Sequence, residues 1–181
     1  MTRRKILLTS AVGLAVALVA SIAGQPPAFA IGPDQEQAEL AKALSGVKVS
    51  LQQGFTASER EGQPVSGKFE MDEGKIQLSI YTAKEGKFYE VIVDHMTGTV
   101  AKVEPITEGE DLAHAKSQKA AMDRAKVKLA DAATKAKGQA KGEAADVLVV
   151  SVIPELKDDR PEATIVLLQG KKFSTASERL D

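Results

Sequence analysis

Residues 65–103 alternate between apolar and polar positions with a period of two, and three short turn sequences interrupt the alternation. The turns contain Glu73-Gly74, Glu85-Gly86 and Thr97-Gly98. This period is typical of β-strands with one buried face, and turns of this composition join neighbouring strands as hairpins. The pattern predicts a meander of about four antiparallel strands.

Helical patterns lie on both sides of this meander. Residues 34–45 form a short helical pattern, and a second begins at Ser50, which has capping-box spacing with Gln53. After the meander, residues 107–142 are predicted to form one long helix. Nine small or apolar positions, His114 among them, fall within one arc of that helix about 120° wide. Strand patterns then resume over residues 147–153, 163–168 and 173–180.

The order of helix followed by strands therefore occurs twice. The spacing Val49-x-Leu51 corresponds to Val127-x-Leu129. The run Ile76–Ile80, followed by Gly86-Lys87-Phe88, corresponds to Thr164–Leu168, followed by Gly170-Lys171-Lys172-Phe173. We expect an α+β fold in which a helix packs on an antiparallel β-meander, with this arrangement occurring twice as a diverged duplication. The expected units are residues 31–106 and residues 107–181, the second beginning with the long helix.

The string V-D-x-x-T-G-x-V occupies residues 93–100. Asp94 can bond the backbone of the turn that contains Thr97, and Gly98 can supply a positive φ that closes a bulged hairpin. With Val49-Ser50-Leu51 and the strands around Leu78–Tyr81 and Val91–Val93, this string resembles a PepSY domain. Such domains occur in propeptides of thermolysin-like proteases and in many exported bacterial proteins.

The resemblance covers residues 47–104 well and residues 120–181 weakly, because the second half lacks the D-x-x-T-G turn. It implies a helix packed on an antiparallel sheet, similar to the cystatin arrangement, in two tandem PepSY-like repeats. It also implies a non-catalytic role in restraining or binding exported proteases or other envelope proteins. The family has no shared catalytic residues.

Residues 1–30 have the features of a cleaved secretory signal peptide. A cationic start at Arg3-Arg4-Lys5 precedes an uncharged stretch from Ile6 to Ala23, and Pro26-Pro27 precedes the A-x-A cleavage site formed by Ala28 and Ala30. We expect a periplasmic or secreted protein without membrane attachment after signal cleavage. An uncleaved membrane anchor is the alternative, because the uncharged stretch approaches spanning length.

Composition excludes several classes of protein. The absence of cysteine excludes a lipoprotein anchor and disulfides. Removal of Arg3, Arg4 and Lys5 lowers the basic residues from 24 to 21 against 25 acidic ones, a net charge of about −4 that argues against nucleic acid as a partner. Residues 112–142 are nonetheless basic. We interpret them as the solvated rim of the long helix, with a polyanion site as the sharper alternative.

Catalytic and metal-binding motifs are not apparent. The sequence has no cysteine nucleophile, no G-x-S-x-G elbow, no H-E-x-x-H zinc site and no phosphate- or dinucleotide-binding glycine loop. Of the two histidines, His95 lies in a predicted turn and His114 in the apolar arc of the predicted helix, where we expect it to be packed or half-exposed. Acidic clusters at Asp72-Glu73, Glu108–Asp111 and Asp158-Asp159 lie at turns or a helix start, without EF-hand spacing. We therefore expect no enzyme, no cofactor and no metal site.

The hypothesis that follows is a non-catalytic exported module that binds another exported or envelope protein. Its specific role would be to inhibit or regulate an envelope or secreted protease, and an exposed sheet edge could accept a strand of that partner. Two alternatives stay open: a periplasmic domain that senses a small ligand or a metal, and a hydrolase with an unrecognised site.

Overall fold

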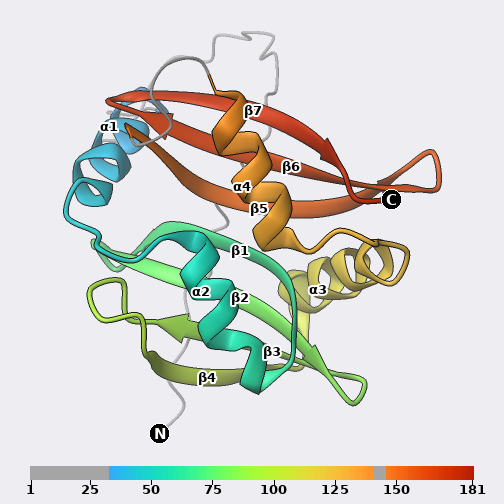
Figure 1. Cartoon of the computed structure of the whole chain (residues 1–181). Coiled ribbons are helices and arrows are strands. Elements are labelled where there is room, and N and C mark those ends of the chain that lie inside the picture. The colour runs from blue at the N-terminus through green and yellow to red at the C-terminus, as the bar shows by residue number, and fades with distance from the viewer. Residues whose placement is uncertain (1–32, 141–145) are drawn as a thin grey trace, which may run out of the picture. The chain divides into compact units, whose positions relative to one another are not determined.

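The computed structural model describes residues 33–140 and 146–181, so the expected signal peptide with Ala28 and Ala30 lies outside the described residues. The fold is α+β, as predicted, and the described part contains four α-helices and one antiparallel seven-stranded sheet (Figure 1). No helix within these two ranges is long and apolar enough to span a bilayer.

The first four strands form the predicted meander. Their bounds are β1 Gln63–Asp72, β2 Lys75–Lys84, β3 Lys87–Val93 and β4 Val100–Ile106. The turns at Glu73-Gly74 and Glu85-Gly86 have positive φ at both residues, 48° and 76° in the first and 53° and 76° in the second. Two-residue turns with this backbone match the twist of the strands that they join.

The last three strands form a second meander in the same sheet. They are β5 Val147–Lys157, β6 Arg160–Gln169 and β7 Lys172–Arg179. The first strands of the two meanders pair with each other, which gives the order β4-β3-β2-β1-β5-β6-β7. This pairing is short, with Gly67 opposite Val152 and Lys68 opposite Ser151. Pro154, two residues beyond Val152, has no N–H to donate toward β1, which limits the pairing in that direction.

Two helices precede the sheet in sequence, α1 (Pro33–Leu44) and α2 (Leu51–Ser58), and the 3-10 turn η1 (Glu59–Glu61) follows α2. The predicted capping box is present, because Ser50 Oγ accepts from the Gln53 N–H at 3.2 Å and the Ser50 N–H donates to Gln53 Oε1 at 2.8 Å. Phe55 on α2 packs over Gly67 of β1. A Cβ at Gly67 would lie 2.7 Å from both the Phe55 ring and Ile80 Cδ1, so this close approach requires glycine.

The prediction of one helix over residues 107–142 is wrong. The structure has two helices, α3 (Gly109–Met122) and α4 (Leu129–Gln139), separated by residues 123–128. The break occurs where the N–H groups of Lys126 and Val127 donate to the Leu180 carbonyl, at 2.6 and 2.9 Å, instead of to a helix. No proline or glycine marks this point, because residues 110–137 contain neither.

The two helices cover opposite faces of the sheet. Ser66 bonds Gln118 of α3, whereas its neighbour Gly67 faces Phe55 of α2, and adjacent strand residues point to opposite faces. α4 lies beside α2 on the other face (Figure 1). The predicted apolar arc is therefore divided between two surfaces, and His114, which was placed in that arc, is exposed. The core comprises the inner faces of the helices and the Val, Leu and Ile residues of the strands.

Candidate functional site

The residues predicted to form the third hairpin turn do so. Asp94 Oδ1 accepts the N–H groups of Met96 and Thr97 at 2.8 and 2.9 Å, and the Gly98 N–H donates to the Asp94 carbonyl at 2.8 Å. Gly98 has a φ of 77°, in the left-handed region. The backbone N–H groups of Thr97 and Met96 lower the pKa of the Asp94 carboxyl. Asp94, Thr97 and Gly98 thus form a hydrogen-bonded turn between β3 and β4.

This turn holds the start of α2. The His95 carbonyl accepts the N–H groups of Lys48 and Val49 at 3.0 and 3.1 Å. The Val49 side chain is buried against the turn, and its methyl carbon would lie 3.5 Å from a Cβ at Gly98. His95 therefore contributes its backbone to the fold, and the turn has a positioning role.

The same backbone contact recurs at the end of β7. The Leu180 carbonyl accepts the N–H groups of Lys126 and Val127 just before α4, and the Leu180 N–H donates to the Pro161 carbonyl at 2.9 Å. The Leu180 side chain is completely buried. These contacts fix the carboxyl end of β7 to both α4 and β6.

The other side of β7 presents an open edge. The two-residue turn Gly170-Lys171 closes on the pair Gln169–Lys172, and in such a hairpin every second residue bonds across to the neighbouring strand. The alternate residues of β7 direct their N–H and C=O groups away from β6: Phe173, Thr175, Ser177 and Arg179. No strand within the described ranges pairs with this side of β7, which we call the β7 edge.

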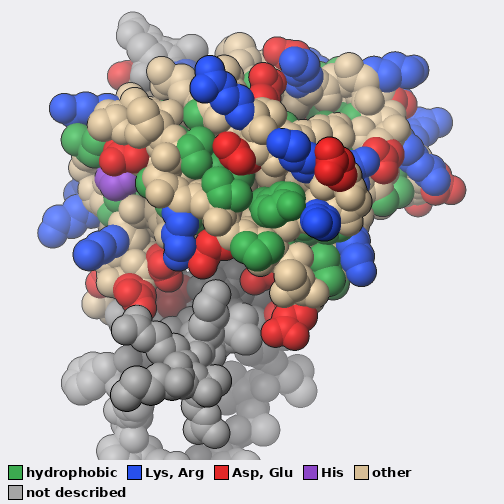
Figure 2. Space-filling model, turned by 90° about the horizontal axis from the view of Figure 1, so that it is seen from below, with side chains coloured by type: hydrophobic (Ala, Val, Ile, Leu, Met, Phe, Trp, Pro, Cys, Tyr) green, Lys and Arg blue, Asp and Glu red, His purple; other side chains and the backbone are tan. Residues whose placement is uncertain are grey.

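The opposite end of the sheet is less accessible to a further strand. By the same alternation, β4 directs the backbone groups of Ala101, Val103 and Pro105 outward, and Pro105 has no N–H. Lys102 beside them is exposed and forms an ion pair with Glu104 at 2.7 Å. Proline and lysine on an edge strand both discourage pairing. Figure 2, which views the molecule from the β4 side, shows hydrophobic side chains interspersed with charged ones there.

On the face of the sheet that α3 covers, two side-chain hydrogen bonds join α3 to the strands and a third joins β2 to β3. Tyr81 Oη donates to Asp111 Oδ1 at 2.9 Å, Ser66 Oγ donates to Gln118 Oε1 at 2.7 Å, and Ser79 Oγ donates to Glu90. Burial raises the pKa values of the Tyr81 phenol and the Glu90 carboxyl. The Tyr81 phenol, a hydrogen-bond donor at neutral pH, thus holds α3 in place through Asp111.

Cations of the basic segment pair with acids of neighbouring elements. Arg124 bonds Asp159 at 2.9 Å, and Lys135 bonds Glu178 at 2.6 Å. Lys119 pairs with Asp123 within the same segment. These pairs favour the interpretation of the segment as a solvated helix rim over a polyanion site. No group of three or more His, Cys, Asp or Glu residues within 33–140 and 146–181 could hold a metal ion.

Sequence reasoning identified the 94–98 turn but not the β7 edge. The pattern over 173–180 predicted a strand, and only the strand order shows that it lies at the end of the sheet. Comparison of the chain with protein-family models, with curated proteins and with solved structures finds no match.

Proposed function

We propose that this chain is an exported, non-catalytic module that binds another exported protein by taking an extended segment of it onto the β7 edge. The observation that carries the proposal is the outer side of an eight-residue strand whose two ends are both fixed, a side with which no strand within 33–140 and 146–181 pairs. Backbone groups of such an edge bond an incoming strand whatever its sequence, and side chains add selectivity.

The fixed ends favour binding because the edge is ordered before a partner arrives. The turn at Gly170-Lys171 sets one end of β7, and the buried Leu180 with its two accepted N–H groups sets the other. An edge that is already extended loses little conformational freedom on binding, so more of the interaction free energy appears as affinity.

The proposal includes two diverged PepSY-like units, residues 31–106 and 107–181. Strands β1–β3 and β5–β7 correspond with a constant difference of 85 in residue number. Ser66 pairs with Tyr81 just as Ser151 pairs with Val166. In each strand pair the register shifts immediately before this serine. The His95 and Leu180 carbonyls, which hold the two helix starts, also differ by 85.

Sequence identities at this spacing support a duplication. Within the strands the identical pairs are Val65 and Val150, Ser66 and Ser151, Glu70 and Glu155, Ile80 and Ile165, Lys87 and Lys172, and Phe88 and Phe173. The strand Ile76–Ile80 then corresponds to residues 161–165, three positions from the match expected from sequence alone. The PepSY resemblance implies the class of partner, an envelope or secreted protease that the module would inhibit or regulate.

The binding proposal is tested by removing one outward N–H. In the Thr175→Pro variant the β7 edge loses a donor while the ladder to β6 keeps its bonds, because the Thr175 N–H points away from β6. The matched control Thr175→Val keeps the N–H. With the mature protein as bait on an envelope extract, we expect wild type and Thr175→Val to retain the same partner and Thr175→Pro to lose it.

Two results would contradict the proposal. Equal retention by Thr175→Pro would place the binding surface elsewhere, and hydrolysis of a defined small substrate by the pure protein would favour an enzyme. Edge binding should also persist at moderate salt, because hydrogen bonds between strands are screened little.

Export is tested separately: mass spectrometry of the envelope fraction should show a mature N-terminus at Ile31.

A further inference from the structure

We infer the kind of strand that the β7 edge accepts: an antiparallel segment with an apolar residue opposite Ala176, a second apolar residue three positions later opposite Phe173, and an acidic residue opposite Lys172. This inference rests on the proposed function, since it specifies the partner segment for the same edge.

The first meander provides the template, because its third strand already carries a strand on the corresponding side. β4 pairs with β3, with Val103 opposite Val91 and Ile106 opposite Phe88. The counterparts of Val91 and Phe88, 85 residues later, are Ala176 and Phe173 of β7. A segment bound at the β7 edge as β4 is bound at β3 would thus place apolar residues at the Val103 and Ile106 positions, three apart.

The two β7 residues can use such apolar neighbours. Ala176 is partly buried and packs against the core on the face that α4 covers, and its side chain is shorter than that of its counterpart Val91. Phe173 is also only partly buried, on the other face, where it pairs with Leu168. An apolar residue opposite each would remove further hydrophobic surface from water.

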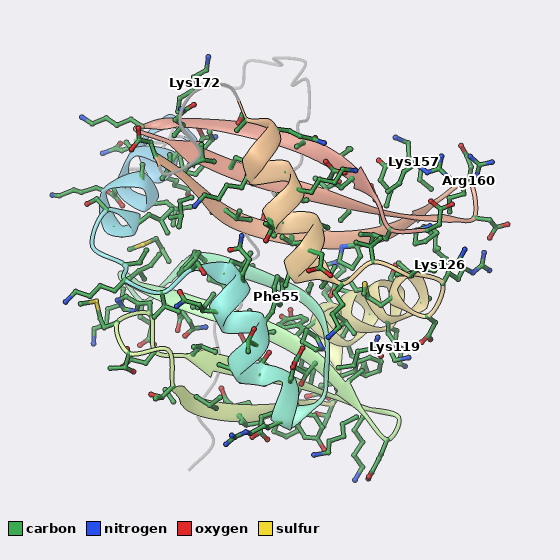
Figure 3. All side chains as sticks on the ribbon, viewed as in Figure 1. Phe55, Lys119, Lys126, Lys157, Arg160 and Lys172 are labelled. Carbon is green, nitrogen blue, oxygen red and sulfur yellow. The ribbon has the colours of Figure 1, made fainter. Side chains whose placement is uncertain are left out.

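The charges near the Gly170-Lys171 turn indicate which residue the bound segment should place opposite Lys172. Lys171 and Lys172 are exposed, and within the described part of the chain no ion pair involves either of them. The single acidic residue of β7, Glu178, is buried and forms an ion pair with Lys135 at 2.6 Å. Lys172 lies at one end of β7, and Arg160 and Lys157 lie near the other (Figure 3). An acid opposite Lys172 therefore meets an uncompensated cation.

The experiment uses the mature protein and four labelled peptides. The reference peptide contains Val-Thr-Thr-Ile-Glu between Thr and Gly flanks. Its variants replace Ile by Ser, replace Glu by Lys, or exchange Val with the adjacent Thr so that the apolar spacing is lost. Fluorescence anisotropy gives the Kd of each peptide, and hydrogen exchange of residues 173–179 reports whether the peptide occupies the edge.

We expect the Ile-to-Ser peptide and the exchanged peptide each to bind about tenfold more weakly than the reference. The Glu-to-Lys peptide should bind about threefold more weakly at low salt and almost equally at high salt. In the Phe173→Ser variant the preference for Ile over Ser should largely disappear, whereas Phe173→Leu should keep it.

The outcomes separate this inference from the proposed function. If all four peptides protect the β7 edge with similar Kd values, the sequence rule is wrong and edge binding stands. If no peptide protects the edge and Thr175→Pro still retains the partner, both fail. Concentration-dependent dimerisation that Thr175→Pro abolishes would identify the occupant as a second copy of the chain and would overturn the rule.

Discussion

The two halves of the sheet hold their helices by the same backbone contact, but they position the accepting carbonyl in different ways. In the first half the His95 carbonyl is held by a hairpin turn in which Asp94 and Gly98 satisfy local backbone requirements. In the second half the Leu180 carbonyl is held by the buried Leu180 side chain and by Pro161 of β6. The position of the accepting carbonyl can therefore be fixed either by hydrogen bonds within a turn or by a buried side chain.

The same difference leaves one strand edge covered and the other open. The turn at residues 94–98 returns the chain as β4, which pairs along the outer side of β3. Leu180 forms no such turn, and within the described residues the outer side of β7 stays unpaired. Because the buried Leu180 side chain, rather than a turn into a further strand, fixes the second carbonyl, the β7 edge on which the proposed function depends stays accessible.

The largest effect that separates the two halves is expected at Leu180. Leu180→Ala should lower the free energy of unfolding by about 2–4 kcal/mol, because it removes a completely buried side chain and leaves a cavity. His95→Ala should change it by less than about 0.5 kcal/mol, because His95 acts through its carbonyl. Urea denaturation measures both. Equal effects would show that the two carbonyls are held in the same way.

A smaller effect is expected at Gly98, where the first half depends on backbone conformation. Gly98→Val should destabilise the protein by about 1–2 kcal/mol, because a β-branched residue is strained at a φ of 77°. The added Cβ itself makes only an ordinary contact, since the nearest atom to it is Val49 Cγ2 at 3.5 Å. Gly46→Ala is the control, because Gly46 has no positive φ and an added Cβ would make only an ordinary contact. An unchanged melting temperature for Gly98→Val would contradict the role given to this turn.

Local features of the fold could be predicted from sequence, and long-range ones could not. The capping box at Ser50 and the turn at Gly98 depend on residues a few positions apart, so their patterns are visible in the chain. The break between α3 and α4 depends on the distant Leu180 carbonyl. The position of β7 at the end of the sheet depends on the pairing of Gly67 with Val152. Neither contact leaves a local signal, so the long helix was wrongly predicted and the β7 edge was missed.

The smallest effect is expected at Glu90, a charged residue without a charged counterpart in the second half. Glu90 of β3 corresponds in position to the neutral Thr175 of β7. Burial raises the pKa of the Glu90 carboxyl, and Glu70 and Asp111 raise it further, while the Ser79 hydroxyl and Lys68 act in the opposite direction. A carboxyl whose pKa is higher in the folded state stabilises the fold while it is protonated, and this contribution is lost as pH rises through the folded pKa.

Glu90→Gln should therefore raise the melting temperature at pH 7, by about 2 °C, because the amide keeps an acceptor for Ser79 without a partly buried charge. The difference from wild type should shrink as pH falls and should vanish at about pH 3, where both the folded and the unfolded carboxyl are protonated. Exposed Glu155, at the corresponding position to Glu70, provides the control, and Glu155→Gln should change the melting temperature at pH 7 by less than Glu90→Gln does, because its side chain lies in water. If Glu90→Gln lowers the melting temperature at pH 7, the Glu90 carboxylate stabilises the first meander through its ionic contacts. The face of the first meander that carries Glu90 would then be held together by charge, in contrast to the corresponding position in β7, which is the neutral Thr175.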